Sequence, residues 1–129
     1  MADKRYTAGF IGIGNMGGTL ASVCAKAVGG AAVAVSGHSP EKAAAFARDY
    51  GCQVLTNSEI AEACDYVFLG VKPQMLPGVL SEISEALKKN QNTTVVSMAA
   101  AVTTETIREG LGGYTGKLVR IMPNMPAKV

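Results

Sequence analysis

The stretch Gly9-Phe10-Ile11-Gly12-Ile13-Gly14-Asn15-Met16-Gly17 decides the fold, because an apolar run leads directly into a Gly-x-Gly-x-x-Gly pattern. Residues 8–12 are nearly all apolar or small, which is typical of a strand buried on both faces. Residues 15–28 carry apolar side chains at helical spacing and precede Gly29-Gly30, so they predict a helix that ends there. The buried stripe expected for this helix is Leu20, Val23, Cys24 and Ala27.

The three glycines of the pattern have separate physical roles. Gly12 permits a tight turn, Gly14 lets the backbone approach a pyrophosphate, and Gly17 lets the helix pack closely on the strand. The free N–H groups and the positive dipole end of the helix then face the phosphates. Glycine-rich turns without a ligand are common, but the order strand, turn, helix favours a dinucleotide site here.

The rest of the chain repeats the alternation of strand and helix. Strands are predicted at 32–35, 53–55, 65–71, 94–97 and 118–122, and helices at 40–50, 77–89 and 104–111. A further small helix is expected after the third strand, capped by Asn57 or Ser58. This alternation predicts an α/β fold, namely a doubly wound, mainly parallel Rossmann sheet with helices on both faces, as one domain over residues 1–129.

The end of the second strand bears on which nicotinamide cofactor fits. NAD-selective domains carry an acidic residue about 20 residues beyond the turn, to bind the ribose 2′-hydroxyl. No acidic residue lies between Asp3 and Glu41, and the segment reads Ser36-Gly37-His38-Ser39. Ser39 caps the next helix, and Lys42 adds a charge in its first turn. We therefore expect NADP, with NADPH favoured over NADH; for His38, an exposed turn residue is an equally open interpretation.

Composition excludes several other classes. The net charge of +2 is too small to predict binding to nucleic acid or to an anionic membrane. The longest apolar stretch, 95–102, is far shorter than a membrane span, and the N-terminus lacks the apolar core of a signal peptide. Three cysteines without Cys-x-x-Cys spacing and one histidine predict reduced, buried thiols, no metal site and a cytoplasmic protein.

Several motifs in order resemble the N-terminal domain of the pyrroline-5-carboxylate reductases. The first is the glycine-rich turn, and the second is Ser39-Pro40. The others are Phe68-Leu69-Gly70-Val71-Lys72-Pro73-Gln74, Val96-Ser97-Met98-Ala99-Ala100-Ala101-Val102-Thr103 and Arg120-Ile121-Met122-Pro123-Asn124-Met125-Pro126. The Val-Lys-Pro and Met-Pro-Asn segments are much more specific than the turn. Two positions depart from the pattern, because many members have Arg in place of His38 and Thr in place of Met125.

The resemblance implies an enzyme that reduces the cyclic imine 1-pyrroline-5-carboxylate to L-proline with NAD(P)H. It implies that a helical C-terminal domain, absent from this chain, forms the dimer and completes the active site. It also implies that the pyrophosphate lies against Ile11, Gly12, Ile13, Gly14, Asn15 and Met16, and that His38, Ser39 and Asn57 lie on the adenosine side. Val71, Lys72 and Pro73 would line the cofactor cleft, and Met98, Ala99 and Ala100 would lie towards the nicotinamide.

The residues themselves indicate no catalytic acid. Hydride transfer to an imine needs mainly position, because the cofactor supplies the chemistry. Asn124 is the one polar candidate on the substrate side, although capping of a turn between prolines explains it equally well. Two other functions stay open: the cofactor domain of another NADP-dependent enzyme, such as a β-hydroxyacid dehydrogenase, and a nucleotide-binding module without catalysis.

Overall fold

The computed structural model describes residues 5–37, 39–89, 92–99 and 102–121. Its strands are β1 (Tyr6–Ile11), β2 (Val33–Ser36), β3 (Gln53–Val54), β4 (Cys64–Leu69), β5 (Thr94–Ser97) and β6 (Leu118–Arg120). Its helices are α1 (Asn15–Val28), α2 (Pro40–Tyr50), α3 (Asn57–Ala63), α4 (Leu76–Lys89) and α5 (Thr104–Gly110). Two short 3₁₀ turns, η1 (Gly30–Ala32) and η2 (Pro73–Met75), precede β2 and α4.

The six strands form one sheet in the order β3-β2-β1-β4-β5-β6, and every neighbouring pair is parallel. In this register Phe10 of β1 lies between Val35 of β2 and Phe68 of β4. The strand order reverses between β1 and β4, so the carboxyl ends of these two strands border the crevice where doubly wound sheets bind ligands. The predicted Rossmann fold is confirmed, and the sheet is parallel throughout.

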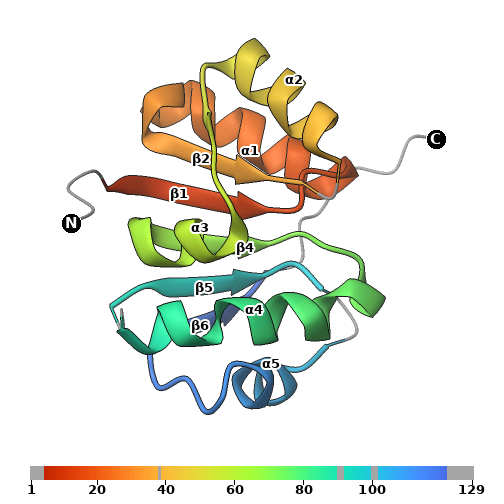
Figure 1. Ribbon diagram of the computed structural model, residues 1–129, viewed down its shortest axis with the longest axis vertical. Coiled ribbons are helices and arrows are strands. Elements are labelled where there is room, and N and C mark those ends of the chain that lie inside the picture. The colour runs from red at the N-terminus through yellow and green to blue at the C-terminus, as the bar shows by residue number, and fades with distance from the viewer. Residues whose placement is uncertain (1–4, 38, 90–91, 100–101, 122–129) are drawn as a thin grey trace.

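Helices cover the two faces of the sheet in separate groups. Figure 1 shows α1 and α2 beside β1 and β2 at one end of the molecule, with α4 and α5 beside β5 and β6 at the other. Alternate residues of β1 point to opposite cores, since Phe10 packs in the cluster of α1 and α2 while Ile11 packs in that of α3, α4 and α5. In α4, Leu80, Ile83 and Leu87 recur at helical spacing and are buried in the second cluster.

Local capping signals set most helix ends as predicted. The Ser39 side chain accepts a hydrogen bond from the backbone N–H of Lys42, and Gly51 ends α2 in the left-handed conformation with φ 73°. The cap of α3 differs from the prediction, because it is Thr56 rather than Asn57 or Ser58. Thr56 and Glu59 form a reciprocal capping box, with N···O distances of 3.2 and 2.9 Å.

The buried face of α1 also differs from the prediction. Ala21 and Ala25 face the sheet, whereas Val23 is 57% exposed and Ala27 is exposed; Leu20 and Cys24 are half-buried. The physical reason is that α1 lies very close to the sheet, because Gly17 packs directly against the backbone of Gly12. Residues four positions apart share a helix face, so small residues follow Gly17 along the contact line and larger ones are turned outward.

Some strand ends are displaced by one or two residues from their predicted positions. The first strand starts at Tyr6 and ends at Ile11, and β4 runs over Cys64–Leu69 instead of 65–71. Gly70 N–H still bonds to Ile11 O at 2.8 Å, after which the chain leaves the sheet and turns at η2. The predicted continuation through Val71 is absent because the neighbouring strand β1 ends at Ile11, opposite Leu69. Met122, the predicted end of the sixth strand, lies outside the described residues.

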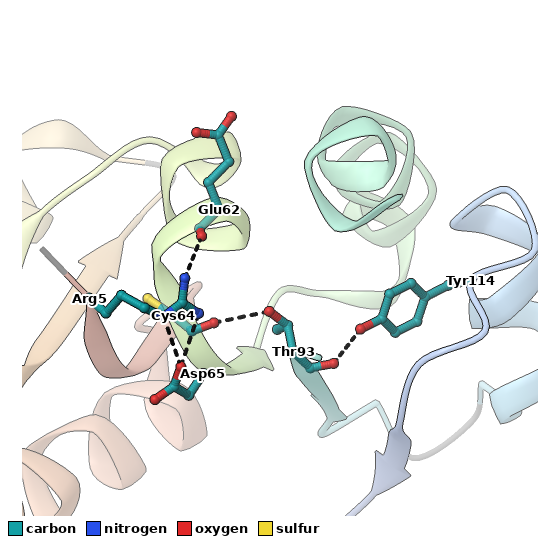
Figure 2. Close-up of polar contacts among 6 residues, drawn as sticks. All are labelled: Arg5, Glu62, Cys64, Asp65, Thr93 and Tyr114. Carbon is teal, nitrogen blue, oxygen red and sulfur yellow. Dashed lines mark hydrogen bonds and ion pairs between the residues drawn. The ribbon is translucent and has the colours of Figure 1, made fainter. Parts of the chain in front are cut away.

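A set of hydrogen bonds ties the amino ends of the strands together (Figure 2). Arg5 bonds the carboxylate of Asp65 at 2.9 Å and the backbone carbonyl of Glu62 at 3.1 Å. The Thr93 hydroxyl donates to the carbonyl of Cys64 at 3.1 Å, and the hydroxyl of the buried Tyr114 donates to the carbonyl of Thr93. The segment before β6 is thereby joined to the segments that begin β5 and β4.

All three cysteines are free thiols. Cys52 and Cys64 are buried as predicted, whereas Cys24 is half-buried. Burial raises the pKa of Cys64 to about 12, so its thiol stays protonated at neutral pH. None of the described helices is long and apolar enough to cross a membrane. Within the described ranges, no group of three or more His, Cys, Asp or Glu side chains is arranged to hold a metal ion.

Candidate cofactor-binding cleft

A cleft of about 900 Å³ lies at the carboxyl edge of the sheet. It is bordered by the turn after β1, the first turns of α1 and α2, and the loop after β4. A second cavity of about 370 Å³ shares Gly12, Gly37, Val71 and Met75 with it. Of the residues singled out in the sequence, the two cavities bring together Ile11, Gly12, Ile13, Gly14, Ser39, Asn57, Val71 and Lys72.

Gly12 occupies a position that only glycine fits. Its φ is +95°, and a β-carbon would lie 2.8 Å from the carbonyl carbon of Gly70 and 2.9 Å from the backbone nitrogen of Val71. The N–H of Gly12 donates to the carbonyl of Ser36 at 2.9 Å. The turn after β1 is thus fixed on one side by β2 and on the other by the end of β4.

Gly14 faces open space. No heavy atom lies within 4 Å of a β-carbon built on it, outside its chain neighbours. Gly14 is the N-cap of α1 and provides no side-chain cap, and the first turn of α1 contains no acidic residue. The first backbone bond of the helix runs from Gly18 N–H to Gly14 O at 2.7 Å, so the N–H groups of residues 15–17 have no acceptor within the helix. This arrangement offers hydrogen-bond donors and a positive dipole end to an anion.

Gly70 is the site residue to which the sequence assigned no role. A β-carbon there would lie 2.9 Å from Gly12 O, 3.2 Å from Gly17 Cα and 2.8 Å from Met98 Cε. The close approach of two turns therefore depends on small residues on both sides. The signals in the sequence were its place in the predicted strand 65–71 and in the Phe68–Gln74 motif.

A polar network closes the second cavity at the end of β2. The hydroxyl of Ser36 donates to Asn57 Oδ1, and Asn57 Nδ2 donates to Glu82 Oε1 at 2.8 Å. Ser36 belongs to β2, Asn57 begins α3, and Glu82 lies in α4. The sequence singled out Asn57 but missed Glu82, because nothing in the order of residues indicates that α4 reaches the end of β2.

The charges around the cleft are mixed. Lys42 and Lys72 line the larger cavity, and so does Asp49, while Glu82 lines the smaller one. The sequence has no acid between Asp3 and Glu41, and among the described residues Glu82, brought from α4, is the only carboxylate that lines the smaller cavity with Ser36. Cationic side chains from α2 and from the loop after β4 line the same cavity as Gly14, the N-cap of α1.

Other predicted residues lie behind the cleft or outside the described part. Pro73 begins η2, and Met98 and Ala99 are buried after β5, where Ala99 N–H bonds to Ser97 Oγ at 3.2 Å. These three residues line neither cavity, although Met98 contacts Gly70. Asn15 and Met16 contribute the first turn of α1 through their backbone. His38, Ala100 and Asn124 lie outside the described residues.

The described residues fit an extended ligand with an anionic centre. Both cavity volumes are typical of sites for small molecules and cofactors. The open space at Gly14 and the unpaired amides of α1 fit a pyrophosphate, and the apolar side chains of Val71 and Met75 give flat groups a surface to lie on. The cleft and the strand order together define a dinucleotide-binding domain.

Comparisons with known proteins agree with this class. Residues 7–101 match the family described as NADP oxidoreductase coenzyme F420-dependent. A pyrroline-5-carboxylate reductase of Escherichia coli is 38% identical over 124 residues, a match that covers 94% of this chain and 45% of that protein. A solved pyrroline-5-carboxylate reductase of Coxiella burnetii superposes with a TM-score of 0.84 at 30% identity, covering 95% of this chain and 46% of that one.

A second solved relative contains the cofactor. The pyrroline carboxylate reductase of Plasmodium falciparum, crystallised with NADP bound, superposes with a TM-score of 0.76 at 26% identity, covering 94% of this chain and 43% of that one.

Fold, cleft and relatives define the class as an NAD(P)-binding oxidoreductase domain. The chain belongs to the NADP oxidoreductase coenzyme F420-dependent family. Its resemblance to the N-terminal part of pyrroline-5-carboxylate reductases is confirmed. The chain spans about half the length of the curated relatives it matches.

Proposed function

We propose that this chain is the cofactor-binding domain of a reductase that converts 1-pyrroline-5-carboxylate to L-proline with NADPH. The observation that carries the proposal is the open turn at Gly14, where the N-terminus of α1 begins. It is supported by the match to a pyrroline-5-carboxylate reductase, which covers 94% of this chain. The substrate is a small imine, and neither nucleic acid nor a membrane takes part. The cytoplasm is the proposed location.

In this proposal the backbone from Ile11 to Met16 holds the pyrophosphate, with donors from the first turn of α1. The adenosine end of the cofactor would be bound by Ser39, His38 and Asn57. Ser39 is the N-cap of α2, so its oxygen lies at the positive end of that helix dipole. Val71 and Lys72 form the wall on the β4 side, continued by Pro73.

The residues after β5 and β6 serve the nicotinamide end. Met98 and Ala99 form a buried floor behind Gly70, and Ala100 continues the segment. Asn124 is proposed on the substrate side.

The cofactor, when bound, supplies a hydride to the imine carbon, and the imine nitrogen takes up a proton to give the amine. The residues of this chain bind the cofactor and orient it. The turn at Gly12 would hold the phosphates, and the packing of Gly70 against Gly12 and Gly17 would keep the adjoining wall of the cleft in place. No residue of this chain is assigned as the proton donor.

Enclosure of the reacting centre is assigned to the second half of the protein, which the longer relatives have. A nicotinamide open to water lacks the surface that orients the imine and excludes solvent. We propose that this second half forms a homodimer and completes the substrate site.

The decisive experiment follows the absorbance of NADPH as it is consumed, with 1-pyrroline-5-carboxylate as substrate. Residues 1–129 alone should show no rate above background, and a protein extended by the C-terminal half should be active. A 3-hydroxy acid offered with NADP serves as the control substrate. Turnover by the isolated domain would place the substrate site elsewhere, and preference for the hydroxy acid would make the protein a β-hydroxyacid dehydrogenase.

A further inference from the structure

Glu82 is the only carboxylate among the described residues that line the smaller cavity. The role assigned to it here, at the adenosine end of the cleft, rests on the proposed function. In dinucleotide-binding domains the adenosine ribose lies at the end of the second strand. In this protein that position is Ser36, which is 8% exposed and lines the smaller cavity together with Asn57 and Glu82.

The Glu82 carboxylate determines which way the Asn57 amide points. An ionised carboxylate only accepts hydrogen bonds, so it must face the nitrogen of the amide and not its oxygen. Asn57 Nδ2 does face Glu82 Oε1, at 2.8 Å. Rotation of the amide by half a turn would place oxygen against oxygen, which loses the hydrogen bond and adds repulsion.

The orientation of Asn57 in turn sets the hydroxyl of Ser36. With Oδ1 directed towards β2, the Ser36 hydroxyl donates its hydrogen to Asn57. Two groups are then left for a ligand: the Ser36 oxygen as an acceptor and the second amide hydrogen of Asn57 as a donor. A ribose hydroxyl matches this pair, because it donates and accepts at once. A phosphate cannot donate to Ser36, so the pair does not select the 2′-phosphate.

We propose that Glu82 is a positioning residue that, through Asn57, sets Ser36 and Asn57 to bind the ribose hydroxyl common to NADH and NADPH. The hydroxyl present in both cofactors is the 3′-hydroxyl of the adenosine ribose. Glu82 acts through the hydrogen bond that its carboxylate accepts from Asn57.

Three variants of the 129-residue chain separate geometry, charge and stability. Glu82→Ala removes the acceptor for Asn57, whereas Glu82→Gln keeps an oxygen acceptor and removes the charge. Glu85→Ala is the matched control, since Glu85 lies on the same helix, forms an ion pair with Lys88 at 3.5 Å and lines neither cavity. Fluorescence titration with NADPH and NADH gives the dissociation constants, and thermal melting reports folding.

Glu82→Ala should weaken both cofactors by the same factor, about three- to tenfold, as expected for one or two misplaced hydrogen bonds. Glu85→Ala should bind within about twofold of the wild type, a change below that of a typical hydrogen bond. Glu82→Gln should fall between Glu82→Ala and the wild type, because its amide can face Asn57 with either its oxygen or its nitrogen. Titration of ADP-ribose and of its analogue lacking the adenosine 3′-hydroxyl gives the ratio of two dissociation constants. A variant that only destabilised the fold would leave this ratio unchanged. The wild type should prefer ADP-ribose, and Glu82→Ala should bind the two alike.

Equal binding by the wild type and Glu82→Ala would overturn the inference and leave the proposed function standing. The same would follow if Glu82→Gln lost as much affinity as Glu82→Ala, or if either variant changed NADPH and NADH by different factors. Failure of the wild type to bind either cofactor would overturn both the inference and the proposed function.

Discussion

Gly12 and Gly70 meet backbone to backbone: a β-carbon on Gly12 would lie 2.8 Å from both the carbonyl carbon and the carbonyl oxygen of Gly70. The contact joins the turn after β1 to the turn after β4, the two loops that border the switch point of the sheet. The shape of the proposed phosphate site is therefore set by two glycines from distant parts of the chain, and not by the glycine-rich pattern alone.

Gly70→Ala should destabilise the protein. The added methyl would press on Gly12 O at 2.9 Å, which is backbone and yields only if the turn moves. We expect a loss of about 1–3 kcal/mol in the free energy of unfolding, typical of overpacking. Urea denaturation measures it, with Gly78→Ala in α4 as the control, because a β-carbon at Gly78 meets nothing within 4 Å. A Gly70→Ala protein as stable as the wild type would show that this contact is loose.

Gly14→Val should affect binding more than folding. The valine points into open space, so the fold loses only the capping preference of glycine over valine, about 1 kcal/mol. The same side chain fills the space proposed for the pyrophosphate, and NADPH affinity should fall at least about tenfold, or 1.4 kcal/mol. Fluorescence titration and a thermal melt on the same sample separate the two effects. Normal melting combined with wild-type affinity would remove the turn from the phosphate site.

NADPH should bind more tightly than NADH at low salt. Lys42 lines the larger cavity in the first turn of α2, next to the Ser39 cap, and exposed cations of this kind contribute about 0.5–1 kcal/mol, or two- to fivefold. The ratio of the two dissociation constants should shrink as salt rises, because charges of exposed groups are screened. Lys42→Gln should reduce the ratio, whereas Lys26→Gln at the end of α1 should not. Equal affinities at low salt would contradict the preference.

Tyr114→Phe should lower stability by about 1–2 kcal/mol, because it leaves the carbonyl of Thr93 without the donor that reaches it from the buried ring. Burial raises the pKa of Tyr114 above its ordinary value near 10, an effect that the nearby Arg108 opposes. The folded state therefore holds this proton more tightly than the unfolded state.

The stability that Tyr114 contributes is complete below about pH 10 and is lost as the pH rises through the folded-state pKa. Urea midpoints at pH 7 and above pH 10 test this, and the gap between wild type and Tyr114→Phe should narrow at the higher pH. The exposed Tyr66 supplies the control, since Tyr66→Phe should change the free energy of unfolding by no more than about 0.5 kcal/mol at either pH. A gap that stays constant with pH would mean that the ring titrates alike in both states.

The sequence alone determined the local elements and their order. The helices α1 and α2 and the strand β5 have the predicted ends, because caps, prolines and stop glycines act within a few residues of where they stand. The glycine-rich turn could likewise be predicted from the sequence, since a strand, three spaced glycines and a helix follow one another directly. Alternation of such elements leaves few topologies besides a parallel sheet covered on both faces.

Only the tertiary structure decided which residues meet across the sheet. The face of α1 depends on how closely Gly17 approaches the first strand, which periodicity does not report, so Val23 was wrongly expected inside. Asn57 is drawn away from the cap of α3 by bonds to Ser36 and Glu82, 21 and 25 residues away in sequence. Such partners are chosen when strands and helices pack, because side-chain hydrogen bonds between separate elements depend on their distance in space, and that distance is fixed by the packed core rather than by the order of residues.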